Sequence, residues 1–210
     1  LNPIRFLIDS YRFARNHASV NNAIFGASAF WLIGGMLQMN LVIHCKHVYL
    51  ASNTTTGMVM ACAAIGIALG CWAAGKISGK EVKKGLILIG IMGMSLMFIV
   101  LTFFHLSLWF FILCVFAVAF MGGLFQIPCL SILQNSGLGR KLGDMIGYLN
   151  LLTFIFVLLG TLFFSLTTQF TSENSYAVFG VILAFCVFVT FWFFVSSPVY
   201  WKETRAMLRK

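Results

Sequence analysis

Acidic side chains are scarce in this 210-residue sequence, and none of them lies deep inside an apolar segment. Carboxylates within membrane-spanning segments are common proton carriers in pumps and transporters. Their absence from the apolar segments argues against a proton-carrying acid in this chain. The five Asp and Glu residues fall at segment edges or in polar gaps: Asp9, Glu81, Asp144, Glu173 and Glu203.

Catalytic and metal-binding motifs are missing as well. The sequence has no G-x-S-x-G elbow, no H-E-x-x-H pair and no P-loop glycine pattern, so no known arrangement supplies a nucleophile and its base. The cysteines form no CxxC motif, and all but Cys45 lie in apolar runs. His44, Cys45 and His47 cluster without an acidic companion, which makes a poor zinc site. We expect no enzyme activity, no cofactor and no metal.

The composition is that of a membrane protein. Charged residues make up 9% of the chain and hydrophobic residues 60%, with a mean hydropathy of +0.97, whereas soluble domains carry roughly 25% charged residues. The net charge of +9 suits attraction to anionic lipid headgroups. No basic patch is interleaved with stacking aromatics in a soluble segment, so we expect membrane lipid and no nucleic acid as partner.

Six apolar stretches are long enough to cross a bilayer, which takes about 20 residues in a helix. They predict an all-α membrane protein with a six-helix transmembrane bundle over residues 21–198 and short connections between the helices. The predicted spans are 23–45, 56–75, 85–104, 107–133, 145–169 and 176–197.

The two ends of the chain are more polar. Within residues 1–20, Ile4, Leu7 and Ile8 recur at helical spacing opposite Arg5 and Asp9, which predicts a short amphipathic linker helix along the cytoplasmic headgroups. A plain linker is the alternative. Residues 199–210 are predicted to form a basic cytoplasmic tail.

Positive charge alternates from gap to gap along the chain. Every Lys and Arg except Lys46 falls at a terminus or in the gaps around Lys80 and Arg140. Basic residues near membrane segments are retained on the cytoplasmic face. The pattern therefore predicts a multi-pass protein with both termini cytoplasmic.

Uncharged hydrogen-bonding groups remain within the predicted spans. An unpaired amide in hydrocarbon costs several kcal/mol, so each such group has to face a partner helix, a water-filled cavity or a ligand. The alternative to a cavity is a set of interhelical bonds that only fix packing. The candidate residues of a polar and aromatic substrate cavity are Trp31, Gln38, Asn40, Gln126 and Asn150.

The distribution of these polar groups predicts an arrangement of helices. The third and sixth spans carry no amide, charged or imidazole side chain, so we expect them at the periphery, with Phe188 and Phe191 pointing outward. The first, second, fourth and fifth spans are expected to meet at the centre. The second has Gly66 and Gly70 in a run of small residues at four-residue intervals, which predicts close packing against a neighbour.

The stretch after the second span is the most specific motif. Gly70, Gly75, Lys76, Gly79 and Lys80 lie in a segment that resembles the glycine-rich basic loop of the Major Facilitator Superfamily, placed after the second helix of each six-helix half. This resemblance implies a conformational loop at these residues. The acidic residue of the family loop is absent, and Ala74 or Gly75 takes its place.

Two further stretches narrow the resemblance. Residues 30–41, and residues 127–134 with 143–150, look like the C-terminal half of bacterial lysophospholipid transporters, which also occur fused to an acyltransferase and an acyl-carrier-protein synthetase. The likeness covers residues 1–198. It implies half of a twelve-helix transporter that moves lysophospholipid, chiefly lysophosphatidylethanolamine, inward across the cytoplasmic (inner) membrane.

The same resemblance implies a partner, either an N-terminal six-helix half or a fused acyltransferase. The chain begins with Leu1, so we expect a piece of a longer protein or an unusual start codon. Two other functions remain open: a facilitator for a drug or metabolite, and an inactive fragment or membrane anchor of a larger fused protein.

The charge pattern makes a testable prediction about topology. A cysteine introduced by Ser78→Cys should react with a membrane-impermeant thiol reagent only after the cells are permeabilised, because the neighbouring basic residues keep this gap in the cytoplasm. The control Glu173→Cys should react in intact cells. Reaction of the Ser78→Cys variant from outside intact cells would show that the topology is inverted.

Overall fold

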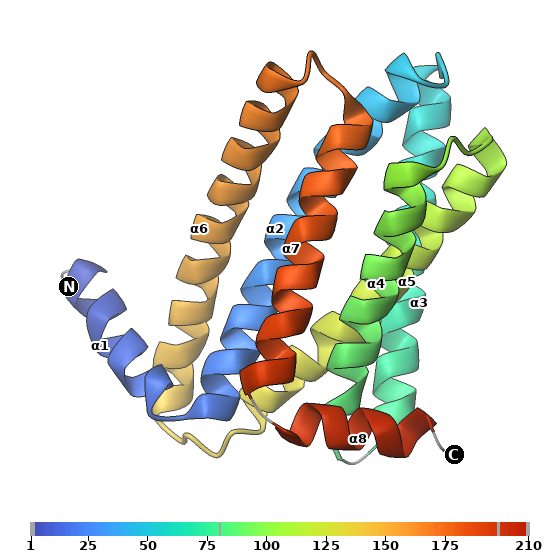
Figure 1. The fold of residues 1–210 in the computed structure, drawn as a ribbon. Coiled ribbons are helices and arrows are strands. Elements are labelled where there is room, and N and C mark those ends of the chain that lie inside the picture. The colour runs from blue at the N-terminus through green and yellow to red at the C-terminus, as the bar shows by residue number, and fades with distance from the viewer. Residues whose placement is uncertain (1–2, 80, 197, 209–210) are drawn as a thin grey trace.

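The computed structural model describes residues 3–79, 81–196 and 198–208. Within these ranges the chain is all helical, and six of the helices are long and apolar enough to cross a membrane. The helices are α1 (Pro3–Arg15), α2 (Ala18–His47), α3 (Asn53–Ser78), α4 (Gly85–Phe103), α5 (Leu108–Gln134), α6 (Lys141–Phe170), α7 (Ser175–Ser196) and α8 (Pro198–Leu208) (Figure 1).

The six predicted spans are confirmed as α2 to α7, and the helix predicted within residues 1–20 is α1. The main difference lies at the helix starts, since α2 begins at Ala18 instead of residue 23 and α6 at Lys141 instead of 145. The first turns of α2 contain polar residues, and a neighbouring helix satisfies one of them. Trp192 on α7 donates a hydrogen bond to Asn22 Oδ1 at 3.3 Å.

Helices α2 and α5 form the centre of the bundle. Helix α5 packs against α3 and α4, α2 packs against α6 and α7, and the two sets meet through α2–α5 and α4–α7 contacts. With the helices taken as the consecutive triplets α2–α4 and α5–α7, the first helix of each triplet packs on the second and third helices of the other triplet. Figure 1 shows α6 at one edge of the bundle and α3 at the other.

Glycines bring the α3 and α5 backbones together. A Cβ atom built on Gly66 would lie 2.7 Å from the Phe116 carbonyl oxygen, and one on Gly70 would collide with the Phe120 carbonyl oxygen. Only a residue without a side chain fits at these positions. The close packing predicted for the second span is confirmed, and α5 is the helix against which it packs.

Glycines allow close contact between other helix pairs as well. A Cβ on Gly160 of α6 would lie 2.9 Å from the Leu32 carbonyl oxygen of α2, and one on Gly90 of α4 would lie 2.7 Å from the Phe125 amide nitrogen of α5. In the helix pairs α3–α5, α2–α6 and α4–α5, a glycine of one helix therefore lies directly against backbone atoms of the other.

The arrangement predicted from span polarity is right for the two central helices α2 and α5 but wrong for α3, α4 and α6 within the described residues, since α3 and α6 lie at the edges (Figure 1). Helix α4 buries Ile87, Leu88 and Ile91 completely, whereas α6 is the least buried of the six spans. Apolar α4 can pack tightly because Gly90 admits α5. The sixth span behaves as predicted at its surface, since Phe188 is 55% and Phe191 66% exposed.

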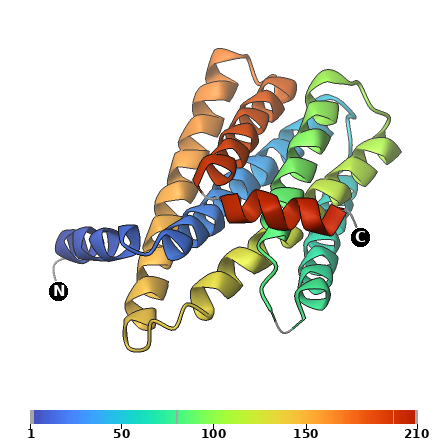
Figure 2. The ribbon, with the colours of Figure 1, turned by 60° about the horizontal axis from the view of Figure 1, so that its bottom comes forward.

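Of the residues 199–210 predicted as a basic tail, those up to Leu208 belong to helix α8, which lies across one end of the bundle (Figure 2), and residues 209 and 210 lie outside the described residues. Its Glu203 carboxylate accepts a hydrogen bond from the Gly85 amide at 3.3 Å, and the Thr204 hydroxyl donates to the Gly85 carbonyl at 3.1 Å. A carboxylate at the first residue of α4 also complements the positive end of the helix dipole. Burial raises the pKa of Tyr200 to about 12, so its hydroxyl stays protonated at neutral pH.

The α3–α5 contact can be tested by adding a single methyl group. Gly70→Ala should lower the thermal stability of the detergent-purified protein, by about 1–3 kcal/mol, because the new Cβ meets the Phe120 carbonyl. The matched control on the same helix is Gly57→Ala, where nothing lies within 4 Å of a built Cβ. Equal unfolding temperatures for the two variants would contradict the backbone contact.

Candidate functional site

One strip of α2 is left largely uncovered by the other described helices. Trp31 is 49% exposed, Gln38 is exposed, and a Cβ built on Gly34 or Gly35 meets nothing within 4 Å. Spacings of three, four and seven residues place these four side-chain positions on one face of the helix. This strip, which we call the open strip of α2, lies near the middle of a 30-residue span.

A second exposed amide lies on α6. Asn150 shares a face with Gly147 and with Phe154, whose side chain is 69% exposed. Near the N-terminal end of this helix, Phe6 of α1 lies 3.5 Å from a Cβ built on Gly147. Asn150 therefore lies next to the region covered by α1, while Phe154 lies beyond it along the helix.

Gln126 lies inside the bundle on α5. Its side chain is only 7% exposed, and its Oε1 atom has no hydrogen-bond partner among the described residues. A buried, unpaired amide oxygen costs about 1–3 kcal/mol. Gln126 is therefore a free acceptor close to the centre of the bundle, and the structure does not join it to Gln38 or Asn150 by any hydrogen bond that it records.

Asn40 lies on the opposite side of α2 from Gln38 and is fully buried. Its Nδ2 atom donates a hydrogen bond to the Ser175 carbonyl oxygen at the start of α7, at 3.0 Å. This is an interhelical bond of the kind that the packing alternative describes. The Oδ1 atom of Asn40 has no partner within the described part of the chain.

His44 strengthens the same junction. Its Nδ1 atom lies 2.7 Å from the Ser175 hydroxyl, and its ring stacks on Phe111 of α5 at 4.6 Å. Tyr176 and Phe179 of α7 approach the ring edge-on. The sequence interpretation did not single out Ser175, and its only signal was a small polar residue at the start of an apolar run. Asn40, His44 and Ser175 form what we call the α2–α7 junction.

The segment predicted as a conformational loop is divided by the structure. Gly70 lies within α3 at the α5 contact, whereas Gly75 and Lys76 lie at the exposed end of the helix, with Lys76 Nζ 5.0 Å from the centre of the Trp72 ring. Gly79 ends α3 with a positive φ of 57°, which favours glycine. Lys80 lies outside the described residues.

The family model of the Major Facilitator Superfamily matches residues 18–208. The chain belongs to the Major Facilitator Superfamily. The match begins at the first residue of α2 and ends at the last residue of α8. No curated protein and no solved structure matches the chain. Together with the six apolar helices, the family identifies a multi-pass membrane transporter of the major facilitator type.

The architecture of this superfamily bears on the open strip of α2. The fold consists of two six-helix halves, and substrates bind near the middle of the bilayer at the interface between repeats. Gln38 and Trp31 lie near the middle of their span, on a face that the described helices leave uncovered. This position makes them candidates for contact with a substrate.

The α2–α7 junction makes a stability prediction. Ser175→Ala should destabilise the protein by about 1–3 kcal/mol, because the buried His44 nitrogen loses its partner while the Asn40 bond to the backbone remains. The matched control on α7 is Ser196→Ala, since the Ser196 hydroxyl donates to the Trp192 carbonyl oxygen of its own helix and joins no second helix among the described residues. Thermal unfolding in detergent measures both, and an unchanged Ser175→Ala midpoint would exclude a stabilising role for the His44 contact.

Proposed function

We propose that this facilitator moves lysophospholipid inward across the cytoplasmic (inner) membrane, with both termini in the cytoplasm. The observation that carries the proposal is the open strip of α2. It presents an amide, Gln38, and an aromatic ring, Trp31, on either side of two glycines at bilayer depth. Such a strip offers both a hydrogen-bonding group and an apolar surface to the same ligand.

The charges of the spans support a headgroup that is neutral overall. Within the described residues, Lys46, Lys76, Lys141 and Asp144 are the ionisable Lys, Arg, Asp and Glu side chains of the six spans, and all lie within a turn or so of a helix end. A zwitterionic phosphoethanolamine headgroup needs no fixed countercharge. The amides of Gln38, Gln126 and Asn150 can donate hydrogen bonds to its phosphate and accept them from its ammonium group.

The surroundings of these groups suit the acyl chain. Helix α6 exposes many large apolar side chains, such as Phe154, Leu158 and Leu162, toward its surroundings. A substrate with one acyl chain can keep that chain in contact with such surfaces while its headgroup meets the amides. A polar metabolite has no acyl chain to place against these apolar side chains.

The proposal includes a partner and a moving part. An N-terminal six-helix half would cover the open strip of α2, and a fused acyltransferase is the alternative partner. The segment that ends α3, with Gly75, Lys76, Gly79 and Lys80, would act as the conformational loop, and Gly70 would hold it to α5.

Uptake of labelled lysophosphatidylethanolamine by the reconstituted full-length transporter tests the proposal. Gln38→Ala, Gln126→Ala and Asn150→Ala should each weaken uptake, because losing one hydrogen bond costs about 0.5–1.5 kcal/mol, equivalent to roughly two- to tenfold. Phe191→Ala on the outer face of α7 is the control and should leave uptake unchanged.

Two results would contradict this proposal in different ways. Normal uptake by all three amide variants at normal membrane abundance would show that the amides serve packing alone. Absence of lysophospholipid uptake by the wild-type protein, with uptake of a drug or metabolite that the same variants impair, would keep the site and change the substrate.

A further inference from the structure

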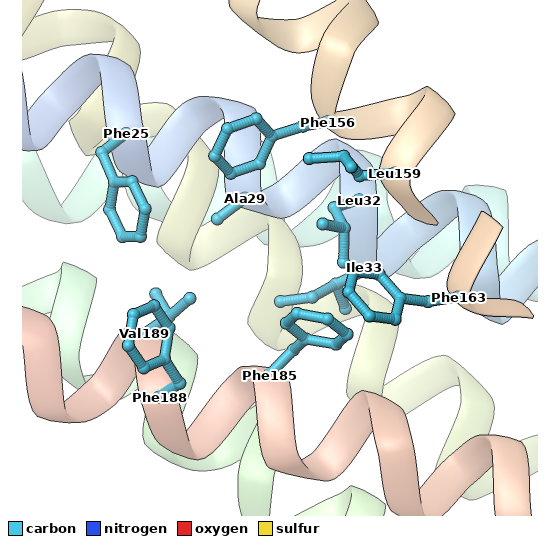
Figure 3. A pocket seen from close by; sticks show the side chains of 10 residues that line it. All are labelled: Phe25, Ala29, Leu32, Ile33, Phe156, Leu159, Phe163, Phe185, Phe188 and Val189. Carbon is cyan, nitrogen blue, oxygen red and sulfur yellow. The ribbon is translucent and has the colours of Figure 1, made fainter. Parts of the chain in front are cut away.

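Helices α6 and α7 both pack on α2 but make few contacts with each other. Between them lies a cleft of about 170 Å³ whose floor is α2. Figure 3 shows side chains of all three helices directed into this space. Every residue that lines the cleft is hydrophobic, and the exposed lining surface has no polar part.

Aromatic side chains close the two ends of the cleft. At one end, Phe163 of α6 meets Phe185 of α7 edge-on, with ring centres 5.0 Å apart. At the other end, Phe25 of α2 meets Phe156 at 6.0 Å and Phe188 at 6.4 Å, again edge-on. The space between these aromatic ends lies over Ala29, a small residue on the floor. The α6–α7 cleft is therefore bounded by α2 below and by aromatic rings at both ends.

The position of the cleft along its helices limits what can enter it. Its lining residues lie between Phe25 and Ile33 of α2, Phe156 and Phe163 of α6, and Phe185 and Val189 of α7. Each of these stretches lies more than four residues from both ends of its span. At this depth in a bilayer the surroundings are hydrocarbon, so headgroups and water are excluded as the main occupants.

The size of the cleft excludes a further helix. A helix with its side chains is about 10–12 Å across, which is far too wide for a slot of this volume. Apolar cavities of about 150 Å³ stay dry and accept a molecule the size of benzene. A short run of methylene groups has the matching chemistry and width.

From these observations we propose that the α6–α7 cleft binds one acyl chain of a bilayer phospholipid. The chain fills the space that α6 and α7 leave above Ala29 and gains contacts with aromatic rings on three helices. It acts as part of the packing between α6 and the rest of the bundle. The proposal depends on the membrane location of the chain and not on which substrate is transported.

Photocrosslinking in liposomes tests this site. The probe is a phosphatidylethanolamine with two acyl chains, one carrying a diazirine near its middle, and mass spectrometry maps the labelled residues. The wild-type protein should be labelled on all three walls of the cleft, at residues such as Ala29, Phe156 and Phe188. It should be labelled more strongly there than at exposed Phe154 or Trp109, which face outward without a cleft.

A variant that fills the slot provides the second measurement. Ala29→Phe should abolish cleft labelling, with Ala29→Leu as a milder replacement if the larger ring prevents folding. Ala64→Phe is the matched control, because Ala64 is an exposed alanine in the middle of α3 and away from the cleft. It should leave the labelling of the cleft unchanged.

Three results would overturn the proposal. The first is labelling spread evenly over all exposed apolar side chains of the wild-type protein. The second is cleft labelling that persists in the folded Ala29→Phe or Ala29→Leu variant. The third is labelling by a single-chain lysophospholipid probe alone, with none by the two-chain probe, which would assign the cleft to the transported lipid instead of the bilayer.

Discussion

The close approach of helix backbones at glycine residues is the contact on which the rest of this bundle depends. In a membrane, lipid tails are as apolar as leucine, so hydrophobic burial does not by itself hold helices together, and close van der Waals contact has to do so. Gly66 and Gly70 place α3 against the carbonyl oxygens of α5, and Gly160 places α6 against a carbonyl of α2. These contacts make α2 and α5 the helices around which the others are arranged, and they leave the opposite faces of α3 and α6 uncovered.

Much of the fold was predictable from the sequence because its main signals are local. The length of each apolar run and the alternation of basic gaps depend on nothing outside the segment, and they located all six spans. The neighbours of each helix were harder to predict. Polarity placed apolar α4 at the periphery, yet Gly90 allows α4 to pack against α5, and Ile87, Leu88 and Ile91 are buried. Helix α8 was missed because its basic residues dominate the composition, while Glu203 and Thr204, which bind Gly85, give no signal until α4 is in place.

The polar groups of the spans fall into two sets. Asn40 and His44 bind Ser175, and Asn22 binds Trp192, so these groups join α2 to α7. Gln38 and Asn150 are exposed, and Gln126 keeps an unpaired oxygen. All of them looked alike in the sequence, because an amide within an apolar run gives no indication of whether another helix will satisfy it. The distinction appears only when the face of each helix is known, and it leaves Gln38, Gln126 and Asn150 as the stronger candidates for contact with a substrate.

The two lipid-related proposals use different sides of α2, and this separation has a physical basis. The side bearing Ala29 and Ile33 meets α6 and α7, carries no polar side chain in the cleft and suits a chain that stays in place. The side bearing Trp31, Gly34 and Gln38 has no partner in the described residues and offers an amide. A transporter needs its substrate to leave again, so its substrate site has to be uncovered in one state and covered in another. In the proposed function, an N-terminal half that docks against the open strip of α2 and moves relative to it would provide that change, while α6 and α7 stay attached to the opposite side of the same helix.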